Sequence, residues 1–133
     1  MVIDSSSLMA IVLAEPDAYV YAEIIIQAVE NQTRLYVPAS VLVEAGIAAE
    51  QRNSGEILDA WLDRLQPEIL PLDRLIAELA RQAFRTFGRG RHKAKLNFGD
   101  CMSYATARYL GLPLLYKGED FRHTDIQSVL RVH

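Results

Sequence analysis

The sequence Leu96-Asn97-Phe98-Gly99-Asp100 decides how the rest of the chain is interpreted. It follows a basic run and begins a pattern of apolar residues at helical spacing that continues to Leu110. A carboxylate in the first turn of a helix lies at the positive end of the helix dipole, so it stays ionised easily and suits a hard cation. The same position fits a capping box, in which Asn97 caps the helix and Asp100 holds its first turn. Both interpretations, metal ligand and helix cap, are open from this stretch alone.

Short apolar strands alternate with helical patterns on both sides of this stretch. Strands are expected at 2–3, 35–37, 69–70, 114–116 and 126–130, and helices at 8–13, 18–29, 41–52, 56–65, 74–87 and 97–110. Strands that alternate with helices form parallel sheets covered on both faces. The sequence therefore predicts an α/β fold, a parallel-sheet sandwich with helices on both faces, in a single domain over residues 1–133.

Capping residues set the expected ends of these helices. The hydroxyls of residues 5–7 are expected to cap the first helix, Asp17 the second, Ser40 the third and Asp73 the fifth. Gly111, followed by a proline, is expected to end the helix that begins at Asn97.

Charge is distributed unevenly along a chain whose net charge is only −3. The four cations Arg89, Arg91, Lys93 and Lys95 lie within seven residues, and the remainder of the chain is acidic. Such a basic run is either a local site for anions or a solvated loop. The protein has no global basic field that would bind nucleic acid.

Cysteine and histidine usage excludes two further kinds of site. Cys101 is the only cysteine, so no disulfide within the chain is possible, and its apolar neighbours predict a buried, inert thiol. The histidines His92, His123 and His133 lack the spacing of zinc ligands. With no signal-peptide pattern and no long apolar run, we expect a cytoplasmic protein without a membrane segment.

Four acids from separate segments are candidates for a functional site. Asp4 ends the first strand, Glu44 lies on the apolar side of its helix and is expected to face the core, Asp100 begins a helix, and Asp120 follows the fourth strand. Each has a structural alternative: a buried salt bridge for Glu44, a helix cap for Asp100, a turn residue for Asp120. Parallel strands bring their carboxyl ends to one edge of the sheet, so the four acids are expected to meet there.

Carboxylates held close together repel one another unless divalent cations join them. Oxygen-only ligands favour Mg²⁺ or Mn²⁺ over zinc, and such sites catalyse phosphodiester chemistry with an activated water. The basic run would then hold the phosphate backbone. Tyr104, Tyr116 and Phe98 would either stack a base or belong to the core.

At this point the chain resembles a known family, the PIN-domain ribonucleases, and within it the VapC-type toxins of bacterial toxin–antitoxin pairs. The resemblance covers nearly the whole chain and rests on four segments in order: residues 2–6 (VIDSS), 38–44 (PASVLVE), 96–100 (LNFGD) and 114–126 (LLYKGEDFRHTDI).

The resemblance implies a sheet with helices on both faces and a metal pocket formed by Asp4, Glu44, Asp100 and Asp120. It leaves Glu119 as an alternative fourth acid. It also implies supporting roles for Ser6, the hydroxyl beside the first aspartate, and for Asn97, at the rim of the pocket.

The implied activity is cleavage of RNA that depends on Mg²⁺ or Mn²⁺. The implied partners are the RNA substrate, a second copy in a homodimer, and a VapB-like antitoxin whose tail covers the acidic pocket. Two alternatives are a catalytically silent PIN-like interaction module and a receiver-type signalling domain, for which Lys117 would be the lysine after a late strand. The receiver fits less well, because Asp4 has no paired acid and Pro71 occupies the place of the phosphoacceptor.

Overall fold

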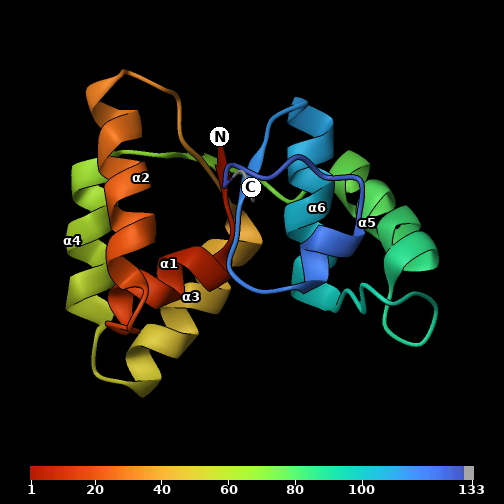
Figure 1. Cartoon of the computed structure of the whole chain (residues 1–133), viewed down its shortest axis with the longest axis horizontal. Coiled ribbons are helices and arrows are strands. Elements are labelled where there is room, and N and C mark those ends of the chain that lie inside the picture. The colour runs from red at the N-terminus through yellow and green to blue at the C-terminus, as the bar shows by residue number, and fades with distance from the viewer. Residues whose placement is uncertain (131–133) are drawn as a thin grey trace.

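The computed structural model describes residues 1–130 and contains a small sheet between two groups of helices (Figure 1). In chain order the elements are β1 (Val2–Ile3), α1 (Ser5–Val12), α2 (Ala18–Glu30), β2 (Tyr36–Pro38), α3 (Ala39–Gln51), α4 (Gly55–Leu65), β3 (Glu68–Leu70), α5 (Arg74–Phe87), α6 (Phe98–Leu110), β4 (Leu114–Leu115) and the 3₁₀ helix η1 (Asp120–His123). Helices α1, α2 and α4 lie on one side of the strands in Figure 1, and α5 and α6 lie on the other.

The sheet is parallel, as the sequence predicts, and its four strands lie in the order β3-β2-β1-β4. Val2 is in register with Leu114, and Ile3 with Leu115, so the carboxyl ends of β1 and β4 lie side by side. Asp4 follows β1 directly, and its amide donates to the carbonyl oxygen of Leu115 over 2.9 Å. This pairing places the residues after β1 beside those after β4, where the predicted site lies.

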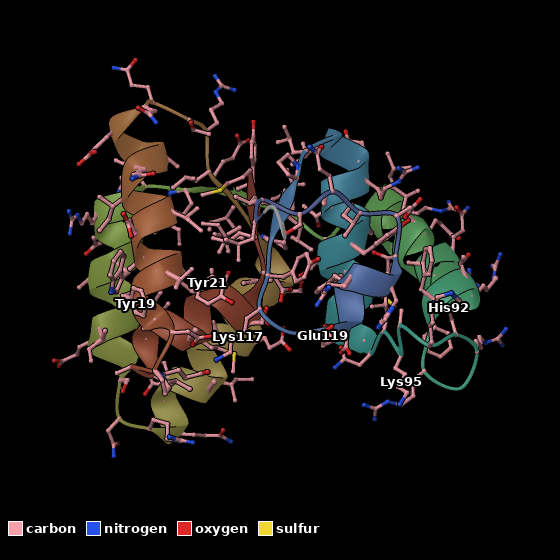
Figure 2. All side chains as sticks on the ribbon, in the orientation of Figure 1. Tyr19, Tyr21, His92, Lys95, Lys117 and Glu119 are labelled. Carbon is pink, nitrogen blue, oxygen red and sulfur yellow. The ribbon has the colours of Figure 1, made fainter. Side chains whose placement is uncertain are left out.

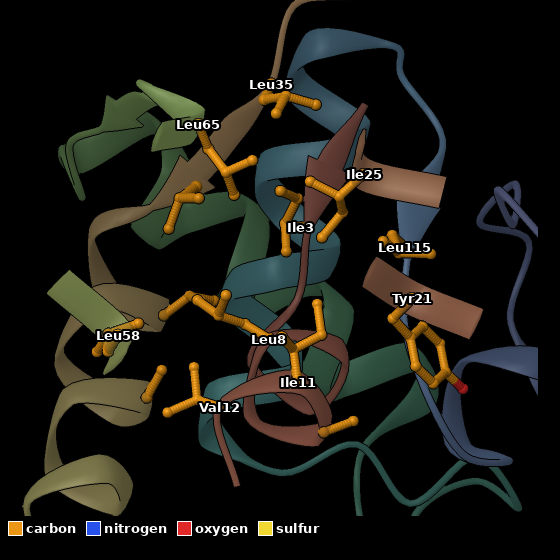
Figure 3. Close-up of a cluster of buried hydrophobic side chains, with 14 of the residues drawn as sticks. Ile3, Leu8, Ile11, Val12, Tyr21, Ile25, Leu35, Leu58, Leu65 and Leu115 are labelled. Atoms are coloured by element: carbon orange, nitrogen blue, oxygen red, sulfur yellow. The ribbon is translucent and has the colours of Figure 1, made fainter. Parts of the chain in front are cut away.

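Alternation along the strands divides the core between the two faces of the sheet. Ile3 and Leu115 pack with α1 to α4 in one hydrophobic cluster, whose members Leu8, Tyr21 and Ile25 are labelled in Figure 3. Val2 and Leu114 point the other way and pack against α5 and α6. Successive side chains of a strand point to opposite faces, so even these two-residue strands stabilise both helical layers. Burying each large aliphatic side chain contributes about 1.5–3 kcal/mol.

Two of the predicted caps are confirmed and three are wrong. The Asp73 carboxylate accepts from the amide of Ile76, and Gly111 ends α6 with a φ of 66° in the left-handed region. The cap of α1 is Asp4 rather than a serine, α3 begins directly after Pro38 without a side-chain cap, and Asp17 makes no capping hydrogen bond. Serine and aspartate are common helix caps, which is why these positions were predicted. Asp4 and Asp17 also make other contacts, which are described below.

The predicted strand at 126–130 is wrong. Within the described residues this segment forms one isolated bridge, between Ser128 and Leu114, and no strand. His133, the last histidine considered above, lies outside the described residues. None of the helices in residues 1–130 has the length and apolar character needed to cross a membrane.

Candidate active site

Asp4 is the most deeply buried acid of the predicted site, with 2% of its surface exposed. One of its carboxylate oxygens accepts from the Ser6 amide at 3.1 Å and from the Ser6 hydroxyl at 2.5 Å. The Ser6 hydroxyl in turn accepts from the Lys117 amide at 2.9 Å. Ser6 therefore connects the end of β1 to the segment that follows β4, and it fixes the direction of the Asp4 carboxylate.

Asp100 combines the two interpretations that its sequence position left open. Its amide donates to Asn97 Oδ1 at 2.9 Å, and its Oδ2 accepts from the Asn97 amide at 3.1 Å, which is a complete capping box. Burial first, and then the nearby acids Asp4, Asp120 and Glu44, raise the pKa of Asp100 to about 6, against a lowering hydrogen bond from Asn97. The cap and the acidic cluster therefore share one carboxylate.

Glu44 does not face the core, contrary to the sequence prediction. The buried row of α3 is formed by Val41, Ala45 and Ala49, four residues apart, whereas Glu44 lies on the neighbouring row and is exposed. Its carboxylate lies against α6: a Cβ added to Gly99 would come within 2.9 Å of Glu44 Oε2. Gly99 therefore leaves the space into which Glu44 extends, next to Asp100.

Of the two candidates for the fourth acid, Asp120 has the stronger connection to the site. Both Asp120 and Glu119 are exposed at the start of η1. Asp120 is among the charges that raise the pKa of Asp100, and Glu119 is not. Glu119 instead pairs with Arg122 at 3.0 Å within the same turn. These contacts favour Asp120.

We refer to Asp4, Glu44, Asp100 and Asp120 as the acidic site. Their oxygen-only donors fit a hard divalent cation. The neighbouring acids contribute, after burial, to the raised pKa of Asp100, and a cation would relieve that repulsion. Within residues 1–130, however, no three His, Cys, Asp or Glu side chains already lie in a metal-holding arrangement. One carboxylate oxygen of Asp4 accepts from Ser6, and one of Asp100 accepts from Asn97.

The basic run forms an exposed loop between α5 and α6, which we call the basic loop. A groove of about 590 Å³ is lined by Arg89, Gly90, Arg91, His92, Lys93 and Lys95. His92 Nδ1 accepts from the Ala94 amide, so this histidine organises the loop. Lys95 and Glu119 both lie in the lower half of Figure 2. The loop directly precedes α6, whose first turn carries Asp100.

The three aromatic candidates for base stacking differ clearly in how exposed they are. Tyr104 and Tyr116 are 8% and 7% exposed and belong to the core, whereas Phe98 is 82% exposed. Phe98 lines a groove of about 500 Å³ together with Phe84 and Met102. Arg91 of the basic loop lies over the other side of this region, 5.7 Å from the centre of the Phe84 ring. Phe98 thus shares a groove with Phe84, the aromatic ring that Arg91 of the basic loop approaches.

The sequence prediction missed one polar group beside the site. Lys117 donates its ammonium group to Glu15 at 2.5 Å and to Asp17 at 2.8 Å. These contacts raise the pKa of Lys117, chiefly through Asp17 and then Glu15. The sequence did offer one indication that Lys117 lies beside the site: it follows β4 directly, and β4 ends next to β1. The predicted buried thiol of Cys101 is confirmed, and burial, followed by Asp100, raises its pKa to about 11.

Comparison with known proteins identifies the class to which this fold and site belong. The family model of the PIN domain matches residues 1–127. The chain therefore belongs to the PIN domain family.

The relatives within this family are VapC ribonucleases. VapC ribonuclease Mb0640 of Mycobacterium bovis is 46% identical over 132 residues, covering 97% of this chain and 98% of that protein. Ribonuclease VapC of Mycolicibacterium smegmatis is 43% identical, covering 97% of this chain and 99% of that protein. Similarity over the full length at this level places the chain with the VapC ribonucleases and excludes the receiver-type signalling domain.

Solved structures support the fold. The crystal structure of Mycobacterium tuberculosis VapC20, a sarcin–ricin loop cleaving toxin, has a TM-score of 0.73 at 16% identity and covers 96% of this chain and 97% of its own. VapBC2 from Rickettsia felis, bound to a DNA fragment from its promoter, has a TM-score of 0.72 at 12% identity and covers 96% of this chain and 95% of its own. The parallel-sheet sandwich is thus shared with VapC proteins of very different sequence.

Proposed function

We propose that this ribonuclease is the toxin of a VapBC-type pair and that it cleaves RNA at the acidic site with Mg²⁺ or Mn²⁺. The observation that carries the proposal is the convergence of Asp4, Glu44, Asp100 and Asp120 from four separate segments. When bound there, a divalent cation lowers the pKa of an attacking water and neutralises charge that develops on the phosphate. Asp4, Glu44, Asp100 and Asp120 would hold it.

The other residues near the site have orienting roles in this proposal. Ser6 holds the Asp4 carboxylate, and Asn97 holds that of Asp100, so neither acid has to be ordered when the cation binds. Gly99 keeps the space beside Glu44 open. Glu119 remains the alternative fourth acid.

The proposed partners follow from the same assignment. They are the RNA substrate, a VapB-like antitoxin whose tail covers the acidic site, and a second copy of the chain in a homodimer. We also propose that the protein acts in the cytoplasm, where RNA is available and a free thiol such as Cys101 stays reduced.

Titration calorimetry with Mn²⁺ tests the metal assignment directly, on antitoxin-free protein and on the Asp4→Asn, Asp100→Asn double variant. We expect binding by the native protein and none by the variant. Failure of the native protein to bind Mn²⁺, together with failure to cleave RNA, would favour the catalytically silent module.

Neutralising the basic loop is expected to reduce the salt dependence of RNA binding. With Arg89, Arg91, Lys93 and Lys95 all changed to glutamine, the slope of log affinity against log salt should fall by about 2–3, since each phosphate contact on a single strand contributes about 0.7. The measurement uses the Asp4→Asn background so that the RNA stays intact. Arg52→Gln with Arg64→Gln, at exposed positions just after α3 and on α4, is the control. An unaltered slope would mean that the loop is only solvated.

Phe98→Ala is expected to weaken RNA binding by about tenfold, because stacking of one base on an aromatic ring contributes roughly 1–3 kcal/mol. Phe98→Trp should retain the affinity. Tyr19→Ala is the control, since Tyr19 is 70% exposed on α2 in the opposite helical layer (Figure 2). Fluorescence anisotropy with a labelled unpaired RNA measures all three. Equal affinities of Phe98→Ala and the control would exclude base stacking on Phe98.

A further inference from the structure

Lys117 is held at both ends by residues that are distant in the sequence. Its amide donates to the Ser6 hydroxyl at 2.9 Å, and its ammonium group donates to Glu15 and Asp17, 102 and 100 residues away, at 2.5 and 2.8 Å. We call Lys117, Glu15 and Asp17 the lysine clamp. Figure 2 shows Lys117 between Tyr21 and Glu119, where the two helical layers approach.

The lysine clamp differs from the other ion pairs of the described residues. Arg81 with Glu78 and Arg122 with Glu119 join residues only three apart in the sequence and are about half exposed, as is the looser pair of Arg108 with Asp125 at 3.9 Å. Lys117 is only 32% exposed in its side chain and has two carboxylate partners. The clamp therefore joins separate segments, the end of β4 and the connection between α1 and α2.

The segment that begins at Lys117 carries the fourth acid of the acidic site. Gly118 follows with a φ of 104°, in the left-handed region, and Glu119 and Asp120 come next. Among the described residues, the hydrogen bonds from this 117–120 segment to sequence-distant partners are all made by Lys117. The position of Asp120 is thus set from two sides, by Lys117 before it and by the buried Phe121 after it, and Lys117 is the one that is hydrogen-bonded to Ser6.

We propose that Lys117 is a positioning residue for the acidic site. Its amide holds Ser6, and through Ser6 the Asp4 carboxylate, while the clamp fixes the start of the turn that carries Asp120. Two acids that follow the carboxyl ends of neighbouring strands are in this way held in position by a residue that touches neither substrate nor cation. This inference rests on the proposed function of the acidic site.

The direction in which the Mn²⁺ affinity changes distinguishes a positioning role of Lys117 from a purely electrostatic one. Lys117→Met removes a positive charge from the segment that carries Asp120, so simple Coulomb repulsion would make Mn²⁺ bind more tightly. Loss of positioning makes Mn²⁺ bind more weakly. A role only in folding lowers the melting temperature and leaves the affinity of the folded protein unchanged.

Titration calorimetry with Mn²⁺ is therefore made on the native protein, Lys117→Met, Lys117→Arg and the control Arg108→Met, which removes one cation and one ion pair elsewhere. We expect about tenfold weaker binding by Lys117→Met, the range seen when groups that orient metal ligands are removed. Lys117→Arg should restore most of the affinity, and Arg108→Met should bind normally. RNA cleavage by Lys117→Met should recover as Mn²⁺ is raised.

Unchanged or tighter Mn²⁺ binding by Lys117→Met would overturn the inference, and so would an equal loss in Arg108→Met. If Lys117→Met does not fold, the Glu15→Gln, Asp17→Asn double variant opens the same clamp from its other side. It should also bind Mn²⁺ more weakly, and normal binding would again overturn the inference. Absence of binding by the native protein would instead overturn the proposed metal site, and the inference with it.

Discussion

The Asp4→Asn variant is expected to lose at least about 100-fold of its RNA cleavage while it keeps its fold. Asparagine has the shape of aspartate and can still accept a hydrogen bond from the Ser6 amide, so the start of α1 stays capped. It lacks the negative charge, and loss of a ligand should cost more than the 10–100-fold typical of groups that only orient ligands. Cleavage of a labelled RNA in the presence of Mn²⁺ measures the loss.

Asp63→Asn is the matched control for this experiment. Asp63 is exposed on α4, in the helical layer that contains α1, so it changes the net charge by the same amount away from the acidic site. Circular dichroism should give native spectra for both variants. Undiminished cleavage by Asp4→Asn would remove Asp4 from the catalytic machinery and, with it, the proposed metal site.

The Asp100→Asn variant is expected to be more stable than the native protein when no metal is present. Burial, chiefly, raises the pKa of Asp100 from 3.8 to about 6, so the ionised carboxylate is disfavoured in the folded chain by roughly 2–3 kcal/mol. Asparagine can keep the capping box without the charge. At pH 7.5 the melting temperature should rise by about 5 °C.

The pH dependence of the Asp100 effect has a definite direction. A carboxyl group whose pKa is higher in the folded than in the unfolded chain contributes most to stability below its unfolded pKa, and the contribution is lost as pH rises through the folded value. The stability gained from Asp100→Asn should therefore appear as pH rises from about 4 to above about 6. Thermal melts across this range, with EDTA present, measure the difference.

Mn²⁺ should make the native protein more stable than Asp100→Asn, the reverse of the order without metal. It stabilises the native chain because it binds the folded state, and it should stabilise Asp100→Asn much less. Asp73→Asn is the matched control, since Asp73 also caps a helix through its carboxylate. A melting response to Mn²⁺ that is the same in Asp100→Asn and the native protein would exclude Asp100 as a ligand.

The sheet and most helices are predictable from the sequence because their signals are local. Apolar strands of two or three residues, the Asp73 cap and Gly111 at the end of α6 each depend on a few neighbouring residues. The segment 126–130 does lie beside β4, but it pairs only with Leu114 of that two-residue strand, and a local sequence pattern does not determine how many residues pair. Only one bridge, at Ser128, is made there in the described residues.

The site was predictable in composition but not in detail. Four acids after strand ends and at a helix start indicated where a site would lie, and Asp100 does experience the charges of the other three. The orientation of Glu44 was wrong because helical periodicity places it one row from the buried row, and the deciding residue is Gly99 on another helix. Lys117 was missed because its partners are more than 100 residues earlier, at separations of 102 and 100.

Because of the capping box at the start of α6, the exchange rate of the Asn97 amide proton should report whether the acidic site is occupied. Asp100 Oδ2 accepts from the Asn97 amide, and a cation drawn to the same oxygen competes for it. Hydrogen exchange at that amide therefore follows the occupancy of the site. It is slow when Asp100 Oδ2 accepts from the amide and faster when that hydrogen bond is lost. An NMR signal from Asn97 would report loading by metal, or covering by a partner, without any label and without any RNA.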